Sequence, residues 1–205
     1  MTLLAIGTYG SDQPVTVVFL HGWGSDERDL AGLARYLPDG LPWASVRAPS
    51  RHPSFGYAWY PLESDTSWED QLPIDEATNA VWDWVDGALG AAAAIVPIGF
   101  SQGGLMASQL LRSRPDRVPA AAILSGYALP SPQPADAVLT QSRPPVFWGR
   151  GALDPVIPAQ AITATEAVLP GIATLEAHVY AGLYHQVSDE ELGHLRTFVE
   201  SVTRP

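Results

Sequence analysis

Short apolar runs alternate with longer segments of helical periodicity along most of the 205-residue chain. The apolar runs, several of them rich in β-branched residues, predict strands at 15–20, 43–46, 92–100, 120–125, 146–149 and 173–180. Segments with apolar residues three and four apart predict helices at 25–37, 68–89, 101–113, 158–169 and 188–203. This alternation predicts an α/β fold, with a mostly parallel central sheet and helices on both faces.

Two prolines modify this pattern. Pro97 lies inside the strand predicted at 92–100, and its missing N–H predicts a bulge or a locally unpaired position there. Pro73 must lie in the first turn of the helix predicted at 68–89 or interrupt that helix. The chain length fits one domain, 1–205, with a core of ordinary size.

The composition narrows the classes of function. Eleven Lys and Arg against 22 Asp and Glu give a formal net charge of −11, which disfavours nucleic acids and anionic membranes as partners. The chain has no cysteine, which excludes disulfides, thiolate nucleophiles and cysteine-based metal sites. The N-terminus lacks the pattern of a signal peptide, and no apolar run is long enough to span a bilayer. We therefore expect a cytoplasmic protein without stable membrane association.

The pentapeptide Gly99-Phe100-Ser101-Gln102-Gly103 matches the pattern G-x-S-x-G. It follows a predicted strand and opens a predicted helix, which is the setting of a nucleophile elbow. In such an elbow the serine occupies a strained turn, and the glycines let neighbouring chain segments approach closely. The pattern therefore predicts Ser101 as a nucleophile. The alternative is a glycine-rich turn in which Ser101 only caps the helix.

A serine nucleophile on such a fold is followed along the chain by an acidic residue and then by a histidine. Of the acidic residues downstream, only Asp154 comes directly after a predicted strand. The others fall at a helix end, in a proline-rich loop, within a helix or within a strand: Asp116, Asp136, Glu166 and Glu176. We therefore expect Asp154 to be the acid; its alternative role is to cap the turn before Pro155.

The base is selected in the same way. His185 lies in the loop between the last predicted strand and the last predicted helix, where an imidazole can reach the serine. The other histidines precede the serine or lie within the last strand or helix: His21, His52, His178 and His194. The hypothesis is that His185 accepts the Ser101 proton, that Asp154 holds the imidazole, and that the acyl group rests on Ser101.

Two backbone amides are candidates for the oxyanion hole. The N–H of Gln102, directly after the nucleophile, is the first. The second comes from the loop after the first parallel strand, where Gly22 and Gly24 flank Trp23, and we expect the Trp23 N–H to serve. The alternative is an ordinary glycine-rich turn ahead of a helix.

These motifs together resemble one known family. The segments LHGWGSDERDL, GFSQGG, LSGYALP, GALDPVIP and GLYHQVSDEEL are similar to those of the phospholipase/carboxylesterase family, which includes bacterial carboxylesterases and acyl-protein thioesterases. The resemblance implies a minimal α/β-hydrolase fold and esterase or thioesterase activity on acyl chains. A cap would enter after the strand at 120–125, but the proline-rich stretch at 126–145 is too short for a helical lid, so we expect an open site.

The substrate is predicted less directly. The aromatic loop around 55–60 and the residues near Asp154 can line an acyl pocket. For the loop, core packing is an equal alternative. The predicted substrate contacts are Phe55, Trp59, Tyr60, Leu153 and Ile157. We expect a carboxylesterase that cleaves short-to-medium-chain, small-molecule esters without cofactor or metal. Thioesterase or peptidase chemistry on the same residues, or a non-catalytic binding protein of this fold, remain the alternatives.

Overall fold

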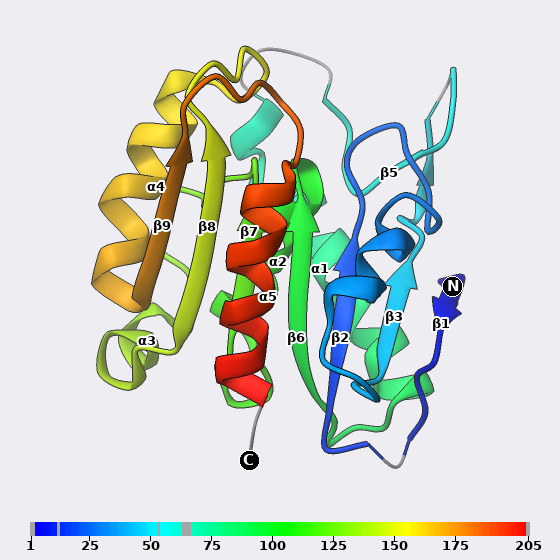
Figure 1. Cartoon of the computed structure of the whole chain (residues 1–205). Coiled ribbons are helices and arrows are strands. Elements are labelled where there is room, and N and C mark those ends of the chain that lie inside the picture. Colours follow the sequence, from blue (N-terminus) through cyan, green and yellow to red (C-terminus); the bar gives the residue numbers. More distant parts are fainter. Residues whose placement is uncertain (1–2, 12, 53, 63–66, 204–205) are drawn as a thin grey trace.

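The computed structural model describes residues 3–11, 13–52, 54–62 and 67–203. Within these residues, seven strands form one sheet in the order β1-β3-β2-β6-β7-β8-β9 (Figure 1). Neighbouring strands are parallel, except that β1 runs antiparallel to β3. The strands are β1 (Ala5–Gly7), β2 (Val15–Leu20), β3 (Trp43–Val46), β6 (Ala94–Phe100), β7 (Ala121–Leu124), β8 (Pro145–Gly151) and β9 (Thr174–Tyr180). A separate ladder pairs β4 (Ser50–Arg51) with β5 (Tyr57–Ala58).

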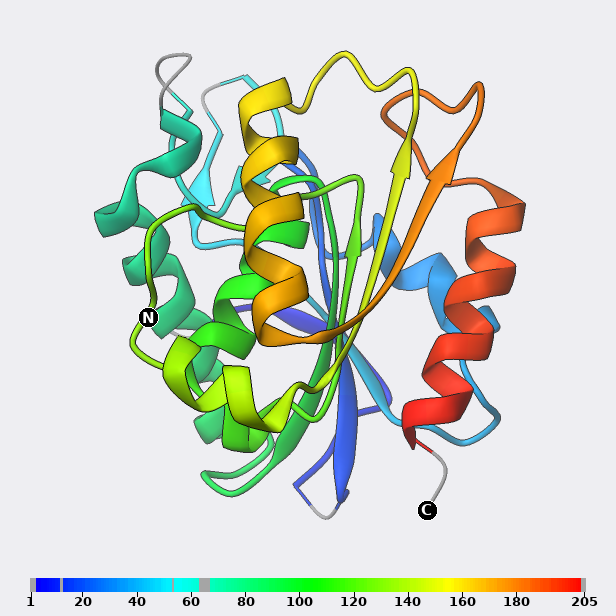
Figure 2. The same ribbon diagram turned by 90° about the vertical axis from the view of Figure 1, so that its left-hand side faces the viewer.

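Helices cover both faces of the sheet. The helices are α1 (Gln71–Ala88), α2 (Gln102–Ser113), α3 (Asp136–Ser142), α4 (Ala159–Ile172) and α5 (Asp189–Thr203), with short 3-10 helices η1 (Leu30–Tyr36), η2 (Ser67–Glu69) and η3 (Pro115–Arg117). Figure 2 shows α1 to α4 on one side of the sheet and α5 with η1 on the other. The predicted α/β-hydrolase architecture is therefore confirmed. No helix in the described part of the chain is long and apolar enough to cross a membrane.

The sheet divides the buried apolar side chains into two cores. The larger core lies under α1, α2 and α4 and includes Trp82 and Met106, both fully buried. The smaller core lies under α5 and η1 and includes Phe19, Phe147 and Phe198. Because the central parallel strands are covered on both faces, they are continuous apolar runs rather than alternating ones.

The predicted unpaired position at Pro97 is found on the side of β6 that faces β7. The register between β6 and β2 runs unbroken through Pro97, which lies opposite Val18. Pairing between β6 and β7 begins only at Ile98, opposite Ala122. The missing N–H is therefore accommodated where β6 has not yet met β7. Pro73, the other questioned proline, lies in the first turn of α1, which runs on past it.

The helix predicted at 25–37 is wrong in type and extent, because only η1 forms there. The residues before η1 are held by contacts with distant segments. Ser25 makes an isolated antiparallel bridge to β5, and Glu27 accepts a hydrogen bond of 2.7 Å from the Arg47 guanidinium. These tertiary contacts outweigh the helical pattern of the segment.

The proline-rich stretch 126–145 contains a short helix, α3, that the sequence pattern did not indicate. In Figure 1, α3 lies at the end of the sheet opposite the arrowheads, and it packs against α4. No helical lid is inserted over the carboxyl ends of the strands by the residues that the structure describes, as expected from the length of this stretch.

Candidate active site

Ser101 occupies the turn between β6 and α2, at the carboxyl edge of the sheet. Its φ of 56° and ψ of −118° are unusual for a residue with a side chain. The Ser101 N–H donates to the Leu124 carbonyl oxygen at 2.9 Å, which ties the turn to β7. This strained, pinned backbone is the geometry expected of a nucleophile elbow.

Two glycines make the turn sterically possible. A Cβ atom at Gly99 would lie 1.8 Å from the Gly103 carbonyl oxygen, and one at Gly103 would lie 1.9 Å from the Leu20 carbonyl oxygen. Both distances are far inside van der Waals contact with backbone atoms. The first and last residues of the G-x-S-x-G pattern must therefore be glycine so that β6, α2 and β2 can pack this closely.

Ser101, His185 and Asp154 form a continuous chain of hydrogen bonds. The Ser101 Oγ lies 2.9 Å from Nε2 of His185, and Nδ1 of His185 lies 2.7 Å from Oδ2 of Asp154. A carboxylate can only accept at Nδ1, so the imidazole proton lies on Nδ1 and Nε2 is free to accept the hydroxyl proton. The side chains come from the carboxyl ends of β6, β8 and β9, which the parallel sheet places at one edge.

The surroundings of His185 and Asp154 hold both groups in place. The Asp154 side chain is 2% exposed, and its other oxygen, Oδ1, accepts from the N–H groups of Val156 at 2.8 Å and Ile157 at 3.2 Å. The Phe100 ring lies against the His185 imidazole, with ring centroids 4.9 Å apart. Asp154 therefore caps the turn that follows it, as the alternative role held, and also bonds His185.

The two candidate oxyanion donors are available. Within the described residues, the backbone N–H groups of Trp23 and Gln102 have no hydrogen-bond acceptor. The Gly24 N–H donates to the Tyr57 carbonyl oxygen at 2.8 Å, which fixes the loop after β2. A Cβ atom on the neighbouring Gly22 would come within 3.5 Å of the Ser101 Cβ, so this loop lies directly beside the serine.

The side chain of Gln102 has a role that the sequence did not indicate. It is 2% exposed; its Oε1 accepts from the Trp59 N–H at 2.9 Å and its Nε2 donates to the Tyr60 carbonyl at 2.7 Å. The side-chain amide therefore connects the turn after Ser101 to the segment that follows β5. Only the observation that a buried amide needs two partners could have suggested this contact.

The five predicted substrate contacts fall into two groups. Trp59, Tyr60 and Ile157 are buried at 2%, 1% and 8% exposure and belong to the larger core. The Trp59 indole N–H donates to the His21 carbonyl oxygen, and the Tyr60 hydroxyl bonds the Tyr127 hydroxyl. Trp59 and Tyr60 therefore pack in the core, which is the alternative considered for the aromatic loop. Their burial gives no support to the prediction that they contact substrate.

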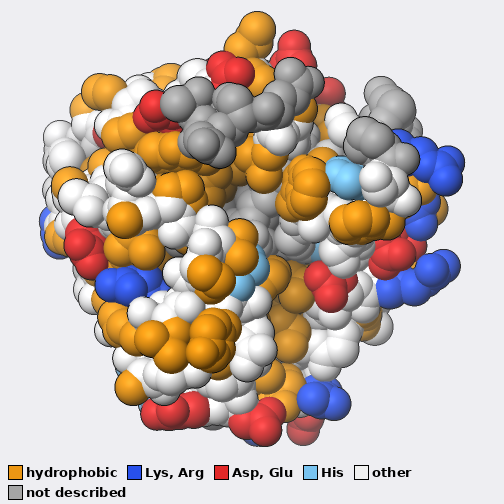
Figure 3. All heavy atoms as spheres, turned by 90° about the horizontal axis from the view of Figure 1, so that it is seen from above, with side chains coloured by type: hydrophobic (Ala, Val, Ile, Leu, Met, Phe, Trp, Pro, Cys, Tyr) orange, Lys and Arg blue, Asp and Glu red, His pale blue; other side chains and the backbone are white. Residues whose placement is uncertain are grey.

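Phe55 and Leu153 remain exposed, at 60% and 49%. The Phe55 ring belongs to an aromatic cluster with His52 and Trp23. Next to this cluster is a largely apolar cavity of about 450 Å³, lined by Trp23, Ser50, Arg51, His52, Ala58, Pro61 and Leu62. Figure 3, which looks onto the carboxyl ends of the strands, shows a central hollow bordered by hydrophobic and histidine side chains.

His21, the first histidine of the chain, has a structural environment. Its ring is fully buried, its Nε2 accepts from the Ala48 N–H at 3.0 Å, and its Nδ1 donates to the Gly22 carbonyl at 2.8 Å. Burial lowers the pKa of His21, which keeps the ring neutral. His21 therefore supports the loop after β2. In the described residues, no group of three His, Cys, Asp or Glu is arranged to hold a metal ion.

Comparisons with known proteins agree with this geometry. A model of the phospholipase/carboxylesterase family matches residues 3–203. Acyl-protein thioesterase 1 of Saccharomyces cerevisiae is 26% identical over 208 residues, covering 90% of this chain and 91% of the yeast protein. The crystal structure of esterase PE8 is 25% identical, with a TM-score of 0.79, over 98% of this chain and 100% of that chain. The carboxylesterase of Bacillus cereus, at 20% identity and a TM-score of 0.82, covers 98% and 94% and has the same fold.

The family match covers nearly the whole chain and confirms the resemblance carried by the sequence motifs. The relatives named above are esterases or thioesterases, so the comparisons support a hydrolase of this kind. With its mostly parallel sheet and its serine turn between β6 and α2, the chain belongs to the phospholipase/carboxylesterase family of α/β-hydrolases.

Proposed function

We propose that this protein is a serine carboxylesterase in which Ser101, His185 and Asp154 act as a triad. The observation that carries the proposal is the pair of hydrogen bonds, 2.9 Å and 2.7 Å, that joins the three side chains in the required order. The strained φ of Ser101 is a second support, because it turns the hydroxyl out of the helix.

The reaction has two halves. Ser101 Oγ attacks the ester carbonyl carbon while Nε2 of His185 takes the hydroxyl proton, and the same proton then passes to the departing alcohol oxygen. The acyl group remains on Ser101 as an ester. A water molecule, deprotonated by His185, attacks that ester; the carboxylic acid leaves and Ser101 Oγ regains its proton. The Asp154 carboxylate stabilises the imidazolium formed in both halves.

The N–H groups of Trp23 and Gln102 are proposed to bind the oxyanion. Both lack an acceptor within the described residues, and both belong to segments that are held by other hydrogen bonds. Donors fixed in advance stabilise the tetrahedral intermediate without reorganisation, and loss of one costs about 3–4 kcal/mol in the barrier.

Short-to-medium-chain esters are the proposed substrates. The cavity of about 450 Å³ beside Trp23 is the proposed acyl pocket, and Phe55 and Leu153 are proposed to line the approach to Ser101. The net charge of −11 favours neutral esters over polyanionic ones. A chain-length series of p-nitrophenyl esters tests this substrate class, and a maximum at long acyl chains would contradict it.

Thioester hydrolysis is the second candidate function, because the yeast relative is an acyl-protein thioesterase. The same triad serves both reactions, so the leaving group decides. Rates on matched butyryl esters and butyryl thioesters separate the two: the proposal expects a higher kcat/KM for the ester.

The experiment that tests the proposed function compares p-nitrophenyl butyrate hydrolysis by the wild-type protein and by Ser101→Ala. The proposal predicts loss of nearly all activity in the variant, with an unchanged circular dichroism spectrum. Equal rates in both proteins would refute the assignment of Ser101. Absence of hydrolysis in both, on esters and thioesters alike, would favour a binding role for the fold.

A further inference from the structure

The two edges of the central sheet differ in length. β1 (Ala5–Gly7) forms one edge with three residues, whereas β9 (Thr174–Tyr180) forms the other with seven. All seven residues of β9 are in register with β8, and no other strand of the described part of the chain pairs with β9. The outer side of β9 therefore presents unpaired backbone N–H and carbonyl groups, which are a template for a further strand.

β9 lacks the features that usually prevent such pairing. Its sequence, TLEAHVY, contains no proline, lysine or arginine, and its ladder with β8 has no bulge. Figure 2 shows β9 between α4 and α5, which lie on opposite sides of the sheet. Glu176 is exposed on the α5 side, and Ala177 and Val179 are exposed on the α4 side. Both faces of the strand therefore reach solvent at this edge.

The side chains of β9 alternate between these two faces. His178 stacks on His194 of α5, with ring centroids 4.3 Å apart, and its Nε2 lies 2.9 Å from Oε1 of Glu176. Glu176 and His178 therefore share the α5 face. Leu175 packs against the larger core, so Leu175 and Val179 share the α4 face.

The sequence of β9 is complementary to itself when two copies run antiparallel about Ala177. In that register Ala177 lies opposite its own copy, Glu176 lies opposite His178, and Leu175 lies opposite Val179. Residues directly opposite one another interact across the ladder. Two carboxylate–imidazole pairs thus form on the α5 face, and two apolar pairs form on the α4 face.

Neighbouring registers are less complementary. Centring the two copies on Glu176 would place the two carboxylates directly opposite each other, and like charges in that position destabilise a ladder. Centring them on His178 would place Glu176 opposite Tyr180 and the two imidazoles opposite each other. A shift by one residue would bring side chains from different faces against each other. The register about Ala177 is therefore the one that matches acid with base.

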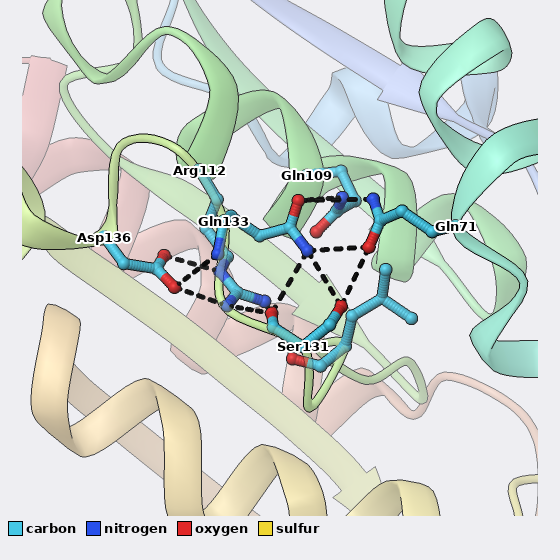
Figure 4. A network of polar contacts seen from close by, with 7 residues as sticks. Gln71, Gln109, Arg112, Ser131, Gln133 and Asp136 are labelled. Atoms are coloured by element: carbon cyan, nitrogen blue, oxygen red, sulfur yellow. Dashed lines mark hydrogen bonds and ion pairs between the residues drawn. The ribbon is translucent and has the colours of Figure 1, made fainter.

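The edge is held in place before any partner binds. The Arg143 guanidinium donates to the Ala173 carbonyl oxygen at 2.8 Å, and the Thr174 hydroxyl donates to the Arg143 carbonyl oxygen at 3.0 Å. α4, which leads into β9, packs against α3. α3 is fixed in turn, because Asp136 accepts from the buried Arg112 guanidinium at 2.8 and 2.7 Å (Figure 4). A preformed edge loses little conformational entropy on association.

We propose that β9 pairs with β9 of a second copy of this chain, antiparallel and centred on Ala177, so that the two sheets become one. The interface is symmetric, since each copy contributes the same strand. The two-fold axis is then perpendicular to the sheet, with α4 of both copies on one face and α5 of both copies on the other. Because the strands run antiparallel, the two carboxyl edges that carry Ser101 face opposite directions.

Sedimentation-velocity ultracentrifugation of the full-length wild-type protein, from about 2 to 200 µM, measures the expected association. Each copy has a formal net charge of −11, so the buffer contains about 0.15 M salt, which screens exposed charges more than about 8 Å apart. We expect a dimer that dissociates on dilution.

Two lysine variants test the position of the contact. Ala177→Lys sets two ammonium groups opposite each other at the axis and should weaken dimerisation about tenfold or more. Ala91→Lys, at an exposed turn before β6, adds the same charge and should dimerise as the wild type does. Circular dichroism checks that both variants keep the wild-type fold.

The absence of cysteine from the chain makes a test of the register possible. Opposite residues of antiparallel strands have Cα atoms about 4.5–5.5 Å apart, which is within the range of a disulfide. Ala177→Cys should therefore form an intermolecular disulfide under mild oxidation, whereas the exposed control Ala91→Cys should not.

Three results would overturn the proposal. A wild-type protein that stays monomeric at the highest concentration would exclude a second copy and favour an extended segment of another protein as the occupant of this edge. The other two are dimerisation of Ala177→Lys as strong as that of the wild type, and cross-linking of Ala177→Cys no faster than that of Ala91→Cys. The outcome is independent of the esterase assignment, because each readout is the mass of the assembly.

Discussion

The side-chain oxygen of Gln102 accepts a hydrogen bond of 2.9 Å from the backbone N–H of Trp59. Through this contact, the residue after the nucleophile holds the segment that follows β5. That strand in turn bonds the loop after β2, since the Tyr57 carbonyl accepts from the Gly24 N–H at 2.8 Å. The two proposed oxyanion donors are thereby connected by a short path of hydrogen bonds.

The first prediction concerns this path. Gln102→Ala keeps the backbone N–H and removes only the side-chain amide, so a role confined to the backbone predicts no change. We expect kcat for p-nitrophenyl butyrate to fall about tenfold to a hundredfold with KM nearly unchanged, because the donors are no longer held in place. Gln141→Ala, at an exposed position on α3, is the matched control. A wild-type kcat in Gln102→Ala would contradict the positioning role.

The second prediction concerns the imidazole tautomer. Asp154→Asn keeps the shape of the side chain but presents an amide that can donate to Nδ1 of His185, which stabilises the wrong tautomer. We expect kcat to fall about 10³- to 10⁴-fold, by analogy with serine proteases that lose this carboxylate. Steady-state kinetics beside the exposed control Asp39→Asn measures the effect. A decrease of only a few-fold would show that Asp154 does not orient the base.

The third prediction contrasts two glycines. Gly103→Ala would place a Cβ atom 1.9 Å from the Leu20 carbonyl oxygen, and backbone must shift to relieve the clash. We expect the free energy of unfolding to fall by at least about 3 kcal/mol in urea titrations. Gly87→Ala, in the last turn of α1 with open space around it, should instead stabilise by about 0.4–1 kcal/mol. Equal effects of the two substitutions would be inconsistent with the packing described for the elbow.

Glu191, in the first turn of α5, is fully buried, and both of its carboxylate oxygens lack a partner among the described residues. Burial raises its pKa from 4.5 to about 7. Gly149 makes this position possible, because a Cβ atom there would lie 2.1 Å from Oε1 of Glu191. The carboxyl is therefore protonated in the folded protein at mildly acidic pH, where it is ionised in the unfolded chain.

The fourth prediction follows from this shift. Because the pKa of Glu191 is raised, this residue does not reduce the stability of the folded protein below pH 4.5. The free energy of unfolding falls as the pH rises towards and beyond 7, where the buried carboxyl ionises. Between pH 5 and pH 8 the ionisation of Glu191 should cost about 2–3 kcal/mol. In Glu191→Gln this contribution is absent, so the stability difference between variant and wild type should grow by that amount over the interval. A stability difference between Glu191→Gln and the wild type that stays constant from pH 5 to pH 8 would refute the assignment to Glu191.

The parallel sheet was predictable from the sequence because its strands are continuous apolar runs bounded by glycine, proline or polar residues. The elements that escaped prediction are those without a local pattern. β1 (Ala5–Gly7) exists as a strand because it pairs with β3, and its three residues carry no periodicity of their own. The helix predicted at 25–37 failed because Ser25 and Glu27 are held by β5 and Arg47, which lie far from them along the chain.

The same distinction applies to the site. The order of serine, acid and histidine, each in a loop after a predicted strand, identified the three side chains that the structure joins, since the topology brings the carboxyl ends of parallel strands to one edge. The role of the aromatic loop could not be predicted in this way. Trp59 and Phe55 are both aromatic and close in sequence, yet one is buried at 2% exposure and the other is 60% exposed. Which of them faces solvent depends on the contacts of His21 and Gln102, which no local pattern encodes.

The central claim, that Ser101 is the nucleophile, is tested most directly by covalent labelling. The wild-type protein would be treated with a fluorophosphonate and examined by intact mass, followed by peptide mapping. We expect one phosphonyl group per chain, located on Ser101, with labelling strongly slowed in His185→Ala. Labelling at another residue, or an unlabelled Ser101 in a folded protein, would contradict this claim.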